Sequence, residues 1–261
     1  MKSWHQSKIL ISCLLALVNC TSLNPVSPGP QPHYLEEVKH QPLLNVFGIL
    51  RPDSLEGWPL SYVHLEFSYP TDDIPDSSII PDAQVQIIKL EGTTVVDSFD
   101  FVYTDWGIFP TREYRNASFF PQEGSYRLIC RKEGFPVLSA ETTVPNLPLI
   151  REETIERQGA TLSFHILRDE QVGVYEVVLE GNNWLVKDRF LRPPSGDVPI
   201  SFSIPNGPCQ LTIYAFDLNL SEYLTVNLSI KPNIYQKDFS MVTNGLGCFG
   251  AMNIYRKMLS G

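Results

Sequence analysis

The sequence predicts an all-β protein made of two consecutive antiparallel β-sandwich domains of the immunoglobulin or transthyretin-like kind. Over most of residues 43–261, apolar and polar residues alternate with a period of two, which is typical of strands with one covered face. Short turn signals separate these runs, as they do in sandwiches. The composition agrees, because Pro is frequent at 21 of 261 residues and β-branched and aromatic residues are plentiful.

The first nineteen residues are predicted to be a signal peptide. Lys2 and Lys8 bracket a short charged start, and the apolar run that follows, 9–18, is shorter than the ~20 residues that a membrane-spanning helix needs. The sequence Leu17-Val18-Asn19-Cys20 resembles a bacterial lipobox, although Asn19 stands where a small residue is usual. This resemblance implies that Cys20 becomes the N-terminus and carries a covalent lipid such as palmitate. Plain secretion and a retained anchor are the alternatives.

Residues 20–42 are predicted to be a Pro-rich tether behind the lipidated Cys20. Four prolines lie close together at 25, 28, 30 and 32, and such a segment tends to stay extended. About 20 residues at ~3.1 Å each reach on the order of 60 Å. Thr21 stands where Asp would signal retention at the inner membrane, so the lipobox resemblance implies lipid anchoring at the outer membrane, on its periplasmic or cell-surface side.

The N-terminal β-sandwich is predicted over residues 43–146. Its expected strands include five alternating runs, at 62–67, 83–87, 95–101, 126–130 and 138–144. Pro145 and Pro148 interrupt the pattern and mark the joint to the next domain.

The C-terminal β-domain is predicted over residues 147–261 and ends in a Gly-rich segment. Its expected strands are at 162–166, 174–179, 184–186, 198–204, 209–215, 224–230 and 249–255. The residues at 181–183 predict a hairpin turn. After the signal peptide no stretch of eleven or more residues has a helical pattern, so a helix-rich fold is not expected.

Several motifs, in order, resemble an uncharacterised family of bacterial outer-membrane lipoproteins that are often encoded beside TonB-dependent receptors. These are the lipoprotein start, an early strand at 44–48, the segment 81–87, and two closing strands at 124–128 and 140–145. The last is a glycine-rich signature at 244–251. The resemblance implies an N-terminal transthyretin-like or carboxypeptidase-regulatory-like sandwich. It also implies that the protein acts as an accessory protein of a receptor. It implies no catalytic residues.

The segment 245–250 reads Gly-x-Gly-x-x-Gly, which is also the spacing of a dinucleotide-binding loop. Such a loop requires a following helix, whereas 249–255 is predicted to be a strand. We therefore interpret these glycines as positions where the backbone bends or approaches a neighbour closely.

The net charge of −9 argues against binding to nucleic acid and against electrostatic attachment to anionic lipid. No nucleophile motif is present, and no His pair has the spacing of a metal site. We predict no enzyme activity and no cofactor other than the lipid on Cys20. The loop of Asp72, Asp73 and Asp76 leaves a calcium site as an alternative, and scattered carboxylates leave a hydrolase as another. Cys130, Cys209 and Cys248 are predicted to be packed free thiols.

An aromatic segment is the best candidate for a binding site. It contains Tyr103, Trp106, Phe109 and Tyr114, which could stack on a sugar or contact a partner protein. The alternative is that these rings cap the core.

We therefore expect a non-catalytic binding or accessory module of the cell envelope. Its expected partners are the membrane, through its lipid anchor, and an outer-membrane receptor or a glycan. A surface adhesin or carbohydrate-binding module is the alternative function.

Overall fold

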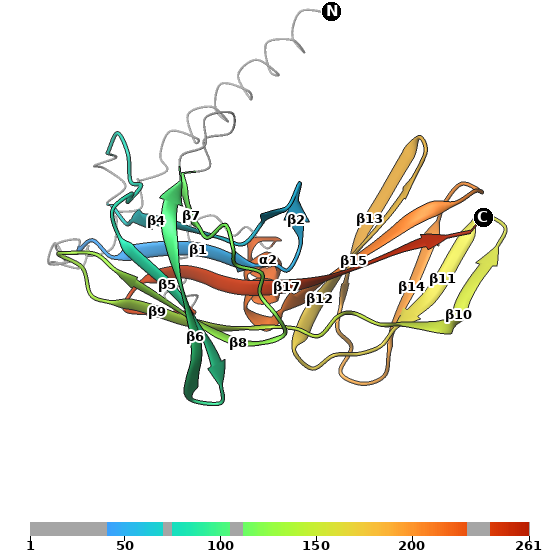
Figure 1. The fold of residues 1–261 in the computed structure, drawn as a ribbon. Coiled ribbons are helices and arrows are strands. Elements are labelled where there is room, and N and C mark those ends of the chain that lie inside the picture. Colours follow the sequence, from blue (N-terminus) through green and yellow to red (C-terminus); the bar gives the residue numbers. More distant parts are fainter. Residues whose placement is uncertain (1–40, 70–74, 105–111, 229–240, 261) are drawn as a thin grey trace, which may run out of the picture. The chain divides into compact units, whose positions relative to one another are not determined.

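Strands make up most of the protein in the computed structural model (Figure 1), which describes residues 41–69, 75–104, 112–228 and 241–260. Residues 41–261 form one compact unit. The predicted all-β class is confirmed. Cys20 and the predicted signal peptide and tether, except Gln41 and Pro42, lie outside the described residues.

The first half of the unit is a group of antiparallel strands wrapped around one core. In spatial order the strands run β1, β4, β7, β6, β5, β8, β9 and β16. Their bounds are β1 Leu44–Leu50, β4 Tyr62–Phe67, β5 Gln84–Glu91, β6 Thr94–Thr104, β7 Glu113–Arg115, β8 Gly124–Arg131, β9 Leu138–Val144 and β16 Val242–Thr243. A small hairpin of β2 (Ser54–Leu55) and β3 (Trp58–Pro59) lies between β1 and β4 in the chain.

The second half packs two sheets face to face. One sheet continues the first, in the order β17, β15, β12, β13, and the other has the order β10, β11, β14. Their bounds are β10 Ile150–Gln158, β11 Thr161–Ile166, β12 Val172–Gly181, β13 Trp184–Leu191, β14 Val198–Ser203, β15 Cys209–Asp217 and β17 Leu246–Leu259. Apolar side chains from both sheets share one core.

The alternation seen in the sequence corresponds to burial. On β8, Tyr126, Leu128 and Cys130 are buried, and on β14 Val198 and Ile200 are buried, while their strand neighbours face outward. All three described cysteines are free and buried, which confirms the prediction of packed thiols. Burial raises the pKa of the Cys130 thiol to about 12, so this thiol is not reactive near neutral pH.

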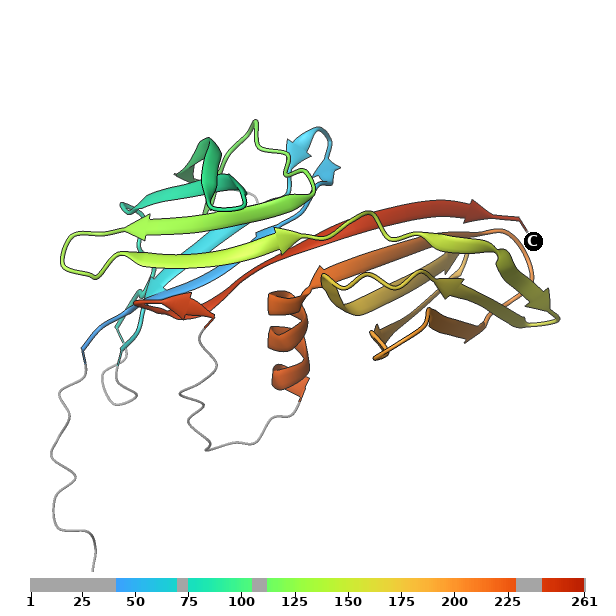
Figure 2. The ribbon, with the colours of Figure 1, turned by 90° about the horizontal axis from the view of Figure 1, so that it is seen from below.

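Strand β17 belongs to both halves. Its first residues pair in parallel with β1, and its later residues pair antiparallel with β15 (Figure 2). The segment 242–251 therefore contributes to the first core, although the sequence division at 146 placed it in the second domain. Period-two alternation reports which face of a strand is buried, but it does not report which distant strand lies beside it.

The glycines of 245–250 allow this close pairing, as predicted from the sequence. Gly247 has a φ of 109°, and a Cβ built on it would lie 1.9 Å from the carbonyl oxygen of Val46. A Cβ on Gly250 would lie 2.7 Å from the Cβ of Leu220. The segment continues as strand β17 and is not followed by a helix in the described chain, so it lacks the context of a dinucleotide site.

Helix α2 (Leu218–Leu228) replaces the strand that we predicted at 224–230, so that prediction is wrong over 224–228. The apolar spacing there suits either structure, since Leu220 and Leu224 are also four residues apart. Tertiary packing decides between them. Leu220, Tyr223 and Leu224 pack with Phe216 and Met252 in a third apolar cluster, on the outer face of the shared sheet.

Asp217 starts helix α2 and connects it to both halves. Its carboxylate is buried and accepts a hydrogen bond from the backbone N–H of Leu220 at 2.8 Å, which caps the helix. It also accepts one from the hydroxyl of Thr142 on β9. Nearby, the amide of Asn219 donates to the carbonyls of Glu141 and Phe249 at 2.7 and 3.0 Å. Polar contacts therefore join the helix to β9 and β17.

We predict that Gly247→Ala lowers the free energy of unfolding by about 3 kcal/mol or more. The new methyl group meets the Val46 carbonyl, and the positive φ is strained for alanine. The control is Gly92→Ala, which has a φ of 60° but no atom within 4 Å of the new Cβ, so it should cost only about 1 kcal/mol. Urea unfolding measures both, and equal losses would contradict the close approach.

We predict that Asp217→Asn reduces the pH dependence of stability. Burial raises the pKa of Asp217 from 3.8 to about 6. Because the pKa is higher in the folded state than in the unfolded state, the protonated carboxyl favours folding. This contribution to the free energy of unfolding is complete below pH ~4 and is lost as the pH rises through about 6. The variant should therefore gain on the order of 2 kcal/mol relative to the wild type between about pH 4 and about pH 7.5. A difference that stays constant with pH in urea unfolding would contradict this.

Candidate functional site

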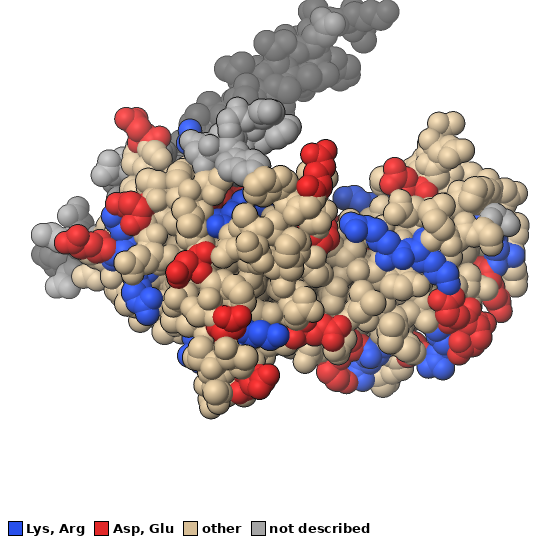
Figure 3. All heavy atoms as spheres, in the orientation of Figure 1, with Lys and Arg blue, Asp and Glu red and all other residues tan. Residues whose placement is uncertain are grey.

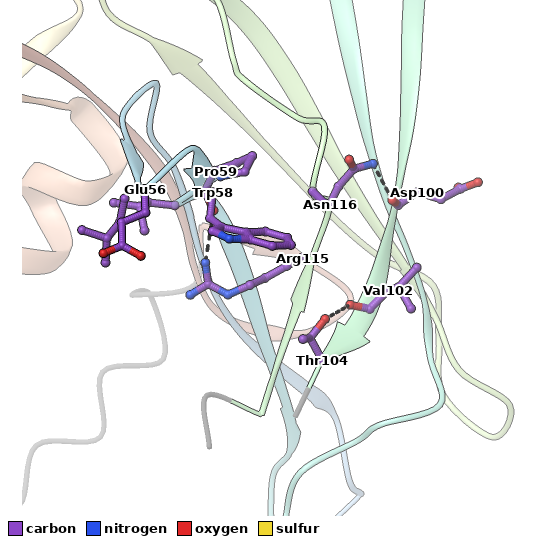
Figure 4. Close-up of a pocket in the computed structure, with 11 residues that line it drawn as sticks. Glu56, Trp58, Pro59, Asp100, Val102, Thr104, Arg115 and Asn116 are labelled. Carbon is purple, nitrogen blue, oxygen red and sulfur yellow. Dashed lines mark hydrogen bonds between the residues drawn. The ribbon is translucent and has the colours of Figure 1, made fainter. Parts of the chain in front are cut away.

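The hairpin of β2 and β3 forms one wall of a surface pocket (Figure 4). Its turn is two residues long, Glu56 and Gly57, with φ values of 52° and 85°. Positive φ at both positions is the geometry of a type I′ turn, in which glycine is favoured. This turn places Leu55 and Trp58 opposite each other at the end of the hairpin.

Strands β6 and β7 and the residues after β7 form the other wall. The pocket has a volume of about 610 Å³. Its lining is mostly apolar on the hairpin side and mixed on the strand side. The lining residues are Leu55, Glu56, Trp58, Pro59, Leu60, Asp100, Val102, Thr104, Arg115, Asn116 and Ala117. In Figure 4 the indole of Trp58 extends from the hairpin toward β6 and Asn116.

Arg115 connects the hairpin to the sheet. Its Nη1 donates to the carbonyl of Pro59 at 3.4 Å. Its Nε and Nη2 donate to one carboxylate oxygen of Glu113 at 3.1 and 2.6 Å. Its guanidinium also lies 5.4 Å from the ring centroid of Tyr62, within range of a cation–π contact. Arg115 is therefore a support for the pocket wall, and its charge is compensated by Glu113.

Other polar side chains of the lining are also hydrogen-bonded within the protein. The amide of Asn116 donates to the carbonyl of Asp100 at 2.8 Å, and the hydroxyl of Thr104 donates to the carbonyl of Val102 at 3.1 Å. The amide of Gln86 donates to the carboxylate of Asp100 at 3.1 Å. These hydrogen bonds hold the pocket wall in place. Outside the lining, burial raises the pKa of Tyr62, and the Glu113 carboxylate raises it further.

Three large apolar side chains of this pocket are exposed. Trp58 is 49% exposed, Leu55 66% and Val102 67%. Gathered around one concavity, they offer apolar surface that a ligand can remove from water. The arrangement can hold an apolar group of a ligand or partner, with an aromatic ring on one side.

Of the four residues that the sequence predicted as a site, the structure describes Tyr103 and Tyr114, which lie opposite each other on β6 and β7. Tyr114 is only 1% exposed, and its hydroxyl donates to Ile80 and accepts from the N–H of Ala83. It is a core residue, which corrects the prediction that it contacts a partner. Tyr103 is half-buried, with its ring 5.5 Å from that of Tyr114. Trp106 and Phe109 lie outside the described residues.

Sequence reasoning missed Trp58 and Val102. Val102 precedes Tyr103 on β6, so the pleat of the strand directs its side chain to the opposite face, where the pocket lies. The sequence Leu55-Glu56-Gly57-Trp58 carried a signal for the hairpin, since a turn with glycine between two apolar residues is typical of one. It carried no signal for what the hairpin would face.

Two other features that the described residues could provide are a metal site and a membrane-spanning helix. Within the described ranges no three His, Cys, Asp or Glu residues gather in a way that could hold a metal ion. Asp76 is described, whereas its calcium-loop neighbours Asp72 and Asp73 are not. Among the helices that the structure describes, none is long and apolar enough to cross a membrane.

We predict that Tyr114→Phe lowers the free energy of unfolding by about 1–2 kcal/mol, because one buried and one partly buried hydrogen bond lose their shared hydroxyl. Ligand capture at the hairpin pocket should be unchanged. Thermal unfolding measures the first effect. A variant as stable as the wild type would show that this hydroxyl does not support the core.

Comparison with known proteins adds little to this description. No family model and no curated protein matches the chain. Among solved structures, the selenomethionine-substituted chicken interferon gamma receptor alpha chain is similar over 67% of this chain and 88% of its own. The two are 9% identical, with a TM-score of 0.20. At that score the likeness supports no conclusion about the function of this chain.

Proposed function

We propose that this protein is a non-catalytic binding module of the bacterial cell envelope, and that the hairpin pocket is its ligand site. The observation that carries the proposal is the gathering of exposed Leu55, Trp58 and Val102 around a concavity of about 610 Å³. Several polar side chains that line it, notably those of Arg115 and Asn116, are occupied by internal hydrogen bonds. Such a pocket suits recognition better than chemistry.

The envelope location in this proposal comes from the sequence. Cys20 follows a lipobox-like Leu17-Val18-Asn19, and a Pro-rich segment separates it from the first strand at Leu44. A module on such a tether can reach a partner in the same membrane. By family resemblance, that partner is an outer-membrane receptor of the TonB-dependent kind, and the pocket would seat an apolar group of the receptor or of its nutrient.

A carbohydrate is the second candidate ligand. The half-exposed indole of Trp58 lines the same pocket as Thr104 and Asn116, and sugars are commonly bound by stacking on such rings. Glycan-array binding that is lost in Trp58→Ala would favour this alternative.

We predict that Trp58→Ala lowers capture of an outer-membrane receptor at least tenfold, as is common for a central aromatic residue of an interface. The measurement is a pull-down of the full-length lipoprotein from detergent-solubilised envelopes, with the receptor identified by mass spectrometry. The free energy of unfolding should fall by less than about 1 kcal/mol, since the side chain is half-exposed.

Two controls accompany this experiment. Leu185→Ala removes an apolar side chain of similar exposure, 58%, from β13 in the second half of the unit, and it should capture as the wild type does. Cys20→Ser should abolish fatty-acid labelling and move the protein from the membrane to the soluble fraction. Equal capture by Trp58→Ala and the wild type would reject the pocket as the site, and an unlabelled wild type would reject the anchor.

A further inference from the structure

Charged groups around the hairpin pocket are mostly acidic. Glu56 is at the tip of the hairpin, Asp100 lies on the opposite wall, and Glu113 lies beside Arg115. Arg115 is the only base among the described lining residues, and it pairs with Glu113 at 2.6 Å. The lining together with Glu113 therefore carries a net negative charge. Next to the hairpin, Arg51 and Arg256 both pair with Asp53.

These acids differ in their availability. Asp100 accepts a hydrogen bond from Gln86, and Figure 4 shows its side chain directed away from Trp58, so it acts through its charge at the rim. Glu56 is exposed, and no ion pair of Glu56 occurs within the described ranges. Its backbone position is held by the positive-φ turn with Gly57. Glu56 is therefore a lining carboxylate without an ion pair in the described residues, and Figure 4 shows it on the side of Trp58 opposite to Asp100 and Val102.

Figure 3 shows charged side chains of both signs separated by wide uncharged areas on the face drawn there. Because charges elsewhere on this face are mixed and scattered, an apolar concavity with an acidic rim discriminates between ligands by charge. A cation near this rim is attracted over the Debye length of ~8–10 Å, whereas an anion is repelled. A cation can also lie over the face of an indole.

We propose that the hairpin pocket binds a ligand that combines an apolar body with a positive group, either an ammonium or a guanidinium. The apolar body packs against Trp58, Leu55 and Val102, and the positive group lies toward Glu56 and the rim. This inference rests on the proposed function, because it names the ligand class of the same site. A free aromatic amine and a basic, apolar peptide segment share this chemistry.

Three probes of similar size and different charge test the proposal. They are 2-phenylethylammonium, 2-phenylethanol and 3-phenylpropionate, each titrated at neutral pH and low salt onto the full-length protein and followed by ligand-observed NMR. We expect the cation to bind roughly three- to tenfold more tightly than the alcohol, and the anion most weakly. Added salt should reduce the preference.

Two substitutions connect that preference to the pocket. Glu56→Gln should reduce the advantage of the cation over the alcohol by roughly twofold or more, while binding of the alcohol stays unchanged. Trp58→Ala should weaken the binding of all three probes. The matched control is Glu91→Gln, which removes an exposed carboxylate from the end of β5, outside the pocket lining, and should change nothing.

The outcomes distinguish this inference from the proposed function. Equal binding of the three probes, lost in Trp58→Ala, would overturn the charge preference and leave the binding module intact. No binding of any probe would overturn both.

Two tripeptides separate the sources of the cation. Acetyl-Lys-Phe-Lys-amide binding more tightly than 2-phenylethylammonium, and more tightly than acetyl-Glu-Phe-Glu-amide, would indicate a peptide ligand. The reverse order between the first two would indicate a free amine. In either case the cationic probe must bind more tightly than its anionic counterpart. Tighter binding of the anionic peptide would overturn the proposal.

Discussion

The fold depends on the close parallel pairing of β17 with β1. This pairing places one strand in the sheets of both halves, because the same strand continues antiparallel to β15. It is sterically possible only where the side chain at position 247 is absent, since a Cβ there would collide with the Val46 carbonyl. A single backbone approach thus decides whether the two strand groups share a sheet or remain separate modules.

The junction that results is polar as well as apolar. Asp217 ends β15, caps helix α2 and binds Thr142 of β9, while Asn253 of β17 donates to the carbonyl of Pro145 at 3.0 Å. Buried polar groups are costly unless they are hydrogen-bonded, so each of these contacts selects one arrangement of the strands around it. Helix α2 covers the apolar outer face that this arrangement leaves on the shared sheet.

The candidate site is formed by the hairpin of β2 and β3 and by strands β6 and β7 of the first half. Its hairpin wall makes few contacts with the core and is held by a turn and by Arg115. A short hairpin of this kind can vary in sequence without disturbing the strands that carry it. This arrangement places a small exposed wall on a rigid support.

The sequence by itself determined the all-β class, the buried face of most strands and the need for glycine at 245–250, because these follow from local periodicity and backbone sterics. It also predicted an aromatic site near Tyr103, but side chains on one strand face opposite sides, and the exposed side belongs to Val102. Only the tertiary structure decided that 218–228 is helical, that β17 joins both halves and that Trp58 faces β6. Each of these depends on which distant surfaces meet, and the energy of that contact is absent from any local pattern.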